Sequence, residues 1–203
     1  MPITPIVKHL LIINVLFFIA LHLLPAEFAE MMPCWSPATG RFQPYQIITY
    51  MFTHFELYHI LFNMMSLFFL GPMVEMTLGA KRFFGLYMIS GLAGLAAHFL
   101  VGYLPYLMGQ SDMGPLFSVL GASGAVFGVT IAFATLYPDR QLMLLFPPIP
   151  IKAWVMALIL IGIGLYQGIT GTGGNVAHFA HLGGALAGFI LARHWKSGGR
   201  FLK

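Results

Sequence analysis

Residues 121–128 read "GASGAVFG", and the apolar run that they open continues to residue 137 without a charged side chain. A run of about 20 such residues, as a helix, crosses the roughly 30 Å hydrocarbon core of a bilayer. The whole chain of 203 residues is 59% hydrophobic and only 8% charged, whereas soluble domains carry about 25% charged residues. We therefore expect a polytopic membrane protein. The net charge of +4 is no indication of nucleic-acid binding, and the one cysteine excludes an internal disulfide.

Six stretches of the chain are long and apolar enough to cross a membrane. Backbone groups in lipid must be satisfied internally, and no alternating pattern is long enough to indicate a barrel, so these stretches are expected to be helices. The fold class predicted is all-α, a six-helix bundle forming a single domain over residues 1–203. The expected spans are 6–25, 52–71, 83–104, 117–137, 151–170 and 177–194.

The basic residues indicate how this bundle lies in the membrane. If the N-terminus is cytoplasmic, nine of the ten basic residues fall on the cytoplasmic side, as the positive-inside rule requires. Both termini are then cytoplasmic, which predicts an integral protein of a bacterial inner membrane. Only Arg41 falls on the outer side; the other nine are Lys8, Lys81, Arg82, Arg140, Lys152, Arg193, Lys196, Arg200 and Lys203.

Three segments leave room for other interpretations. The first span, followed by "LLPAEFA", somewhat resembles a secretory signal, although its apolar run is long for one. The outer loop 26–50 contains aromatic residues and prolines, which favours a segment lying in the membrane interface. The connection 168–175, "GITGTGGN", has four glycines and is expected to be mobile, so this loop or the fifth span is a candidate gate for a substrate.

Polar residues inside the membrane are costly and need an explanation. In "HFELYHILFN", residues 54–63, His59 and Asn63 are four positions apart and share a helix face. Taken alone, this pair is explained well by a polar contact between helices. In "GASG", Ser123 lies beside Gly121 and Gly124, and taken alone this motif is explained well by close helix packing.

A third polar cluster is "NVAHFAHLGGALAG", residues 175–188. His178 and His181 are three positions apart and lie on roughly one face of the expected helix. Gly184 and Gly188 form a small-xxx-small pair, which predicts tight packing against a neighbouring helix.

Depth brings these clusters together, because the second, fourth and sixth spans run in the same direction. His59, Ser123 and His181 each lie near the outer start of their spans and are therefore expected at one level. An imidazole can take the proton of a serine hydroxyl and later donate it to a leaving amine. His59, Asn63 and the backbone N–H of Ser123 can supply the donors for an oxyanion hole. Phe127, one turn after Ser123, is a candidate to stack on the base.

A serine–histidine dyad is expected rather than a triad. None of the acidic residues lies at a depth that suits a third member, since most are in loops or at span ends. The six are Glu27, Glu30, Glu56, Glu75, Asp112 and Asp139.

With these motifs in their order, the sequence resembles the rhomboid family of intramembrane serine proteases. "GASG" is similar to the family's GxSG motif, "HILFN" to HxxxN and "AHLGGALAG" to AHxxGxxxG. "VEMTLGAKRF" also resembles the family's loop after the second span, with Glu75 and Gly79 in place. The resemblance covers roughly residues 6–195, and the short termini resemble the compact six-helix bacterial form.

The resemblance implies a role for each matching position. Ser123 would be the nucleophile and His181, which directly precedes "LGG", the general base. His59 and Asn63 would line the oxyanion hole, and Gly121 would shape the loop before the serine.

Two further positions have a supporting role by the same resemblance. His54 matches a histidine that supports the outer loop, and Phe127 replaces a tyrosine that stacks on the base in some members. The family cleaves transmembrane protein substrates near the outer membrane surface, without metal or cofactor, at sites where the substrate helix unwinds easily.

Two other functions are compatible with parts of the sequence. A non-catalytic rhomboid-like protein that binds membrane clients would generally lack the serine or the histidine. A metal transporter would use four histidines, but no HExxH motif occurs and no acidic ligand accompanies them. The four are His54, His59, His178 and His181.

Overall fold

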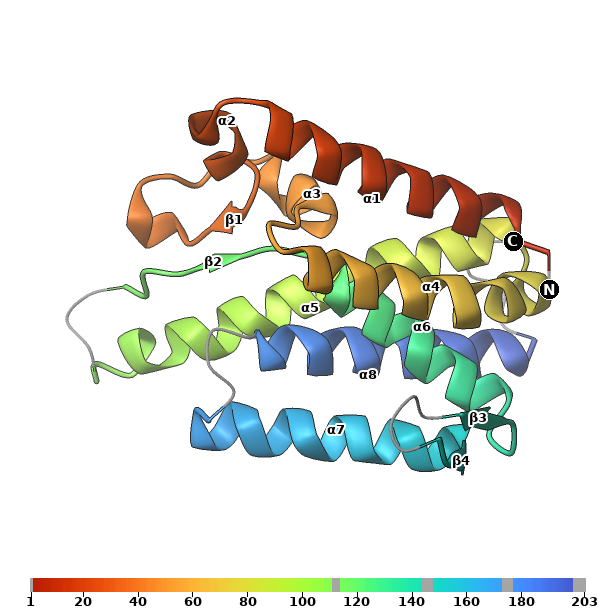
Figure 1. Cartoon of the computed structure of the whole chain (residues 1–203). Helices are drawn as coiled ribbons and strands as arrows, with labels where there is room; N and C mark the ends of the chain where they lie inside the picture. The colour runs from red at the N-terminus through yellow and green to blue at the C-terminus, as the bar shows by residue number, and fades with distance from the viewer. Residues whose placement is uncertain (1, 111–113, 144–147, 173–176, 199–203) are drawn as a thin grey trace.

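The computed structural model describes residues 2–110, 114–143, 148–172 and 177–198. In these ranges six helices have 14 or more residues, and they pack side by side into one bundle (Figure 1). Short elements lie between them, mostly in the connection between α1 and α4. The long helices are α1 (Pro5–Leu23), α4 (Leu57–Leu78), α5 (Ala80–Leu107), α6 (Ser123–Leu136), α7 (Ala153–Thr170) and α8 (His178–Lys196).

Four of these helices are long and apolar enough to cross a membrane: α1, α4, α5 and α7. α6 is apolar but has only 14 residues, and α8 carries histidines and basic residues along its 19 residues. All six long helices coincide with the expected spans, while the crossing of the membrane by α6 and α8 stays a prediction.

Three of the expected boundaries are wrong by five residues or more. The second span was expected to end at residue 71, but α4 continues to Leu78. The second span was expected to begin at residue 52, but α4 begins at Leu57 because residues 50–52 form a 3-10 turn and Glu56 is extended. The fourth span was expected from residue 117, but α6 begins at Ser123. Ser118 and Val119 instead form a strand, and Gly121 has a φ of 104°, which a helix does not accommodate. Hydropathy does not mark the start of α6, since the residues directly before this helix are mostly apolar.

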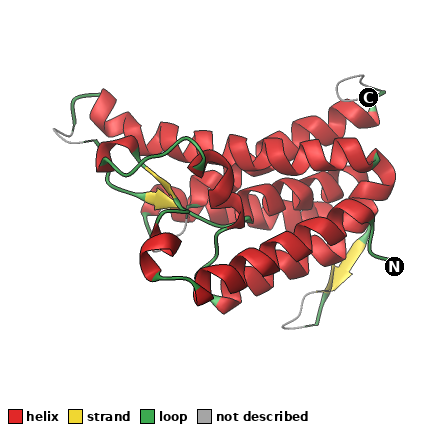
Figure 2. Ribbon diagram, turned by 90° about the horizontal axis from the view of Figure 1, so that it is seen from above, coloured by secondary structure: helices red, strands yellow, loops and turns green. Residues whose placement is uncertain are grey.

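The all-α prediction needs a small amendment, because two short antiparallel strand pairs occur. β1 (Cys34–Trp35) pairs with β2 (Ser118–Val119), and β3 (Gln141–Met143) pairs with β4 (Pro150–Lys152). The first pair ties the connection between α1 and α4 to the segment that precedes Ser123. Figure 2 shows the strands at the ends of the helical bundle.

The connection between α1 and α4 contains several short elements, while its predicted place in the membrane interface stays a prediction. Its remaining elements are α2 (Ala26–Glu30), η1 (Pro37–Thr39), α3 (Gln46–Thr49) and η2 (Tyr50–Phe52). These elements lie at the end of the bundle where α1 ends and where α4, α6 and α8 begin (Figure 1). We call this end the serine end.

The described basic residues are divided between the two ends of the bundle, and the side of the membrane that each end faces stays a prediction. α1 begins, and α4, α6 and α8 end, at the bundle end opposite the serine end (Figure 1), and seven basic residues lie on or beside these helix ends. Arg41 lies in the connection at the serine end, while Arg200, Lys203 and the acidic Asp112 fall outside the described residues. The seven are Lys8, Lys81, Arg82, Arg140, Lys152, Arg193 and Lys196.

The glycine-rich connection before α8 is shorter than expected. Residues 168–170 belong to α7, which ends with Gly171 in the left-handed conformation at a φ of 67°. Residues 173–176 lie outside the described part of the chain, so the predicted mobility of this connection stays a prediction.

Backbone contact between α6 and α8 confirms the predicted small-residue packing. A Cβ atom added to Gly184 would lie 2.0 Å from the carbonyl oxygen of Gly124, and one added to Gly188 would lie 2.2 Å from that of Gly128. Since only glycine lets two backbones approach this closely, these positions set the distance between the two helices.

Candidate active site

Ser123 is the first residue of α6, and the loop before it is held from outside that helix. The N–H of Gly121 donates a hydrogen bond of 2.8 Å to the carbonyl of Tyr50. The φ of 104° at Gly121 turns the chain into α6. Because the first N–H groups of a helix have no intrahelical acceptor, the backbone N–H of Ser123 is a donor at the helix start.

His181 lies one turn into α8 and faces this serine. Its Nε2 is 2.8 Å from the Oγ of Ser123, although the residues are 58 positions apart. The glycine contact between α6 and α8 lies one residue beyond Ser123, at Gly124 and Gly184. Helix packing therefore brings the two side chains within hydrogen-bond distance, as the depth argument expected.

Phe127 stacks on the imidazole of His181. Their ring centroids are 4.3 Å apart and the ring planes differ by 7°. Phe127 lies one turn after Ser123 on the same helix, so α6 provides both the hydroxyl and the surface that orients the imidazole. This contact agrees with the stacking expected from the sequence.

His59 and Asn63 lie on the first turns of α4, beside the loop that precedes Ser123. A Cβ atom on Gly121 would be 2.5 Å from the His59 ring, so the absence of a side chain at Gly121 makes room for this histidine. The Nδ2 of Asn63 is 3.1 Å from the carbonyl oxygen of His59 and 3.2 Å from the Nε2 of His54. Both amide hydrogens of Asn63 therefore face an acceptor, although the single lone pair of the His54 Nε2 is shared with the N–H of Ala122. One of the two Asn63 contacts has to break before Asn63 can donate to an oxyanion.

His54 is more closely tied to the serine loop than the sequence indicated. Its Nε2 accepts a hydrogen bond of 3.2 Å from the N–H of Ala122, and its Nδ1 faces the carbonyl of Phe52 at 3.3 Å. An acceptor Nε2 requires the hydrogen on Nδ1, so these contacts fix one tautomer. His54, fully buried, thus connects the residue before the serine with Asn63.

Two histidines near His181 each have one buried ring nitrogen without a hydrogen-bond partner in the described part of the chain. The ring of His178 lies 6.4 Å from that of His181, nearly perpendicular to it, and its Nε2 is buried without a hydrogen-bond partner. The Nδ1 of His98, on α5, is buried and unpartnered in the same way. The sequence reasoning missed His98, because a single histidine in an apolar helix has no motif to distinguish it.

Among the described residues, no hydrogen bond or ion pair joins an acidic side chain to Ser123 or His181. The carboxylate of Glu75 accepts hydrogen bonds from the Thr4 hydroxyl and from the N–H groups of Ile6 and Val7, at the start of α1. Within the described residues no three histidine, cysteine or acidic side chains are placed to hold a metal ion.

Comparisons with known proteins agree with the family resemblance. A family model of the Rhomboid domain matches residues 41–195. The chain is 38% identical over 144 residues to "Rhomboid protein 1, mitochondrial" of Saccharomyces cerevisiae and 33% identical over 164 residues to "RHOMBOID-like protein 12, mitochondrial" of Arabidopsis thaliana. It is 27% identical over 148 residues to "Rhomboid protease GluP" of Bacillus subtilis.

The matched regions cover most of this chain but less than half of each relative. They include 71%, 76% and 73% of the chain, and 40%, 48% and 25% of the three proteins in the same order.

Proposed function

Because this chain belongs to the rhomboid family of membrane proteins, we propose that it is an intramembrane serine endopeptidase acting through a Ser123–His181 dyad. The observation that carries this proposal is the 2.8 Å contact between the Ser123 hydroxyl and the His181 Nε2. A nucleophile within hydrogen-bond reach of a base is the minimum arrangement for acyl transfer.

The proposed first step is the attack of the Ser123 Oγ on the carbonyl carbon of a peptide bond. His181 Nε2 takes the hydroxyl proton, and the carbonyl π electrons move onto the oxygen. His181 then donates this proton to the leaving nitrogen as the C–N bond breaks, which leaves an ester on Ser123. Water attacks the ester with His181 again as base, and the carboxylate product leaves with Ser123 restored.

The negative oxygen of the tetrahedral intermediate needs preplaced donors. We assign the N–H of Ser123, the side chain of Asn63 and the ring of His59 to this role, with Gly121 and Gly124 shaping the backbone around them. Rotation of the Asn63 amide away from His54 or from the His59 carbonyl supplies the free N–H. Phe127 keeps the imidazole in line with the hydroxyl.

The proposed substrates are transmembrane proteins cleaved close to the serine end of the bundle. A peptide bond inside a helix is shielded and its carbonyl is already hydrogen-bonded, so the substrate has to unwind locally. We propose that the chain lies in a bacterial inner membrane with six spans and cytoplasmic termini, and that it acts without a metal or cofactor. The proposed gate for the substrate is α7 or the connection 168–175. The full chain 1–203 is proposed to act as one domain.

The test uses purified protein, a reconstituted single-pass substrate and a fluorophosphonate probe. The wild type should cleave the substrate and bind the probe covalently, whereas Ser123→Ala and His181→Ala should lose cleavage while remaining folded. Ser118→Ala is the matched control, because this serine is exposed and lies in β2, five residues before Ser123. Chelators should leave the cleavage rate unchanged.

Full cleavage by Ser123→Ala would remove the proposed mechanism. A folded wild-type protein that binds a membrane client but neither cleaves nor takes up the probe would instead indicate a non-catalytic, client-binding rhomboid-like protein.

A further inference from the structure

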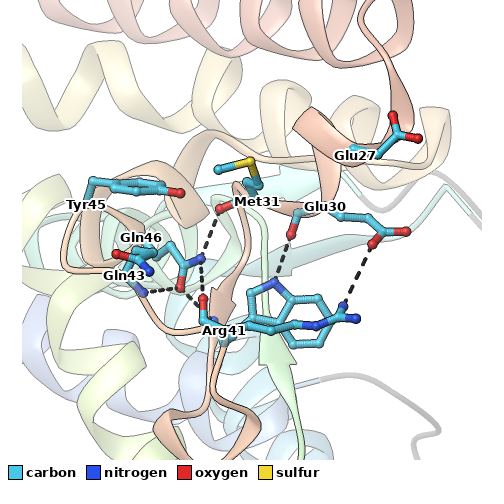
Figure 3. Close-up of a pocket in the computed structure, with 8 residues that line it drawn as sticks. Glu27, Glu30, Met31, Arg41, Gln43, Tyr45 and Gln46 are labelled. Atoms are coloured by element: carbon cyan, nitrogen blue, oxygen red, sulfur yellow. Dashed lines mark hydrogen bonds and ion pairs between the residues drawn. The ribbon is translucent and has the colours of Figure 1, made fainter.

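A cavity of about 300 Å³ lies in the connection between α1 and α4, at the serine end of the bundle (Figure 3). Its lining includes two acids, Glu27 and Glu30, one base, Arg41, and the aromatic rings of Trp35 and Tyr45. Its volume is at the lower end of the range for small-molecule sites. The proposed protease mechanism uses none of these residues.

The floor of this cavity is a built structure that depends on Gln46. This side chain is 1% exposed, and its Nε2 donates to the carbonyl oxygens of Met31 and Arg41 at 3.0 and 3.1 Å. Its Oε1 accepts from the N–H groups of Gln43 and Trp35 at 3.0 and 3.3 Å. One buried amide therefore connects four backbone positions around the cavity and holds its lining together (Figure 3).

Of the three charged side chains around the cavity, Arg41 and Glu30 contact each other and Glu27 does not take part in this pair. The guanidinium of Arg41 lies 5.0 Å from the centre of the Trp35 ring and 3.8 Å from the carboxylate of Glu30. The Trp35 ring is further held by a hydrogen bond of 2.8 Å from its Nε1 to the Glu30 carbonyl. Glu27 has no hydrogen bond or ion pair within the described part of the chain. Two carboxylates and one guanidinium leave a net charge of −1, which favours a cationic group.

The cavity lies next to apolar surface. Leu24, Phe28 and Met31 are 44%, 42% and 51% exposed, and they follow directly from the end of the apolar helix α1. In the proposed membrane orientation, this surface would extend from the acyl region to the level of the headgroups. A ligand with a charged head and apolar chains fits both parts, which a soluble cation or a peptide end does not.

We propose that this cavity binds the headgroup of a zwitterionic aminophospholipid of the ethanolamine type. The ammonium hydrogen-bonds to Glu27, the phosphate takes the N–H donors of Arg41 that the long Glu30 contact leaves open, and the acyl chains lie along Leu24 and Phe28. A primary ammonium has three N–H donors for carboxylates, whereas the choline group has none. Choline is recognised by open aromatic faces, and here Arg41 covers a face of Trp35.

A bound headgroup also acts on the segment before Ser123. Trp35 pairs with Ser118 and Cys34 with Val119 in the β1–β2 ladder, and the N–H of Ser36 donates to the carbonyl of Phe117 at 2.9 Å. A ligand that binds only the folded connection raises its stability by mass action. Lipid binding should therefore raise the thermal midpoint of the protein.

The experiment measures lipids retained by the purified protein, using native mass spectrometry and thermal unfolding in nanodiscs. Nanodiscs of dioleoyl phosphatidylethanolamine, phosphatidylcholine or phosphatidylglycerol, each mixed equally with a neutral carrier lipid, serve as probes. We expect the protein to retain ethanolamine lipid at least fivefold over choline lipid, with a higher thermal midpoint. Glu27→Gln should lose this preference, while Asp139→Asn, an exposed acid at the opposite end, should keep it.

Equal retention of ethanolamine and choline lipids by the wild type, or an unchanged preference in Glu27→Gln, would overturn the proposal. So would displacement of the lipid by a lysine-rich peptide at equal concentration, since that result identifies a peptide site. Ser123→Ala should keep the full preference, so this readout is independent of whether the chain is a protease.

Discussion

The contact between Gly184 and Gly124 offers the sharpest test of how the bundle positions the dyad. In Gly184→Ala, the new Cβ would lie 2.0 Å from the Gly124 carbonyl oxygen and 2.7 Å from its carbon. Both are backbone atoms, so no side-chain rotation relieves the overlap. The two helices have to move apart.

The size of the effect follows from this overlap. Restoring an ordinary contact of 3.4 Å requires a local separation of about 1.4 Å. Ser123 directly precedes Gly124, so its hydroxyl moves with this part of α6. In the wild type the hydroxyl lies 2.8 Å from the His181 Nε2, and the separation takes it beyond the distance of about 3.2 Å that proton transfer needs. Misplacement of about 1 Å costs about 10²-fold in rate, and overpacking costs about 1–3 kcal/mol of stability.

We therefore expect Gly184→Ala to lower kcat/KM about 10²-fold or more in the reconstituted cleavage assay and to slow fluorophosphonate labelling similarly. Gly162→Ala is the matched control, because this glycine lies in α7 with nothing within 4 Å of the new Cβ. It should keep wild-type activity and gain about 0.5–1 kcal/mol from helix propensity. Wild-type cleavage by Gly184→Ala would refute the claim that this contact sets the dyad distance.

Three further predictions concern residues around the site and at the two ends of the bundle. Phe127→Leu removes the ring that stacks on His181 at 4.3 Å and should lower kcat about tenfold, because the imidazole is then held less firmly. Phe127→Tyr keeps an aromatic ring and should retain cleavage. Equal rates for both variants would contradict an orienting role of this ring. Glu75→Gln weakens three hydrogen bonds at the start of α1 and should cost about 1.5–3 kcal/mol in an SDS unfolding titration, while the exposed Glu56→Gln should change stability by less than about 0.5 kcal/mol. Burial raises the pKa of the Cys34 thiol to about 11, so the thiol stays protonated in the folded protein. Labelling with a maleimide at pH 8 should therefore be slow until the protein is unfolded. Rapid labelling of the folded protein would count against this burial.

The sequence alone predicted the membrane class, the order of the helices and the family, and the family is confirmed. These features are local: apolar runs of spanning length, basic residues at one side and short motifs are visible in the order of the residues. The sequence also predicted that the last helix packs tightly on a neighbour, because glycines four apart on one helix indicate close backbone approach. The structure identifies that neighbour as α6.

Only the tertiary structure decided the starts of α4 and α6, since both depend on partners far along the chain. Val119 pairs with Cys34, and the N–H of Gly121 binds the Tyr50 carbonyl, so residues that hydropathy assigns to a helix are extended instead. The link from His54 to Ala122 and the position of Glu75 at the start of α1 are likewise hydrogen bonds between segments at least 68 positions apart. Hydropathy and short motifs do not predict such pairings, because these hydrogen bonds form only after the helices have packed.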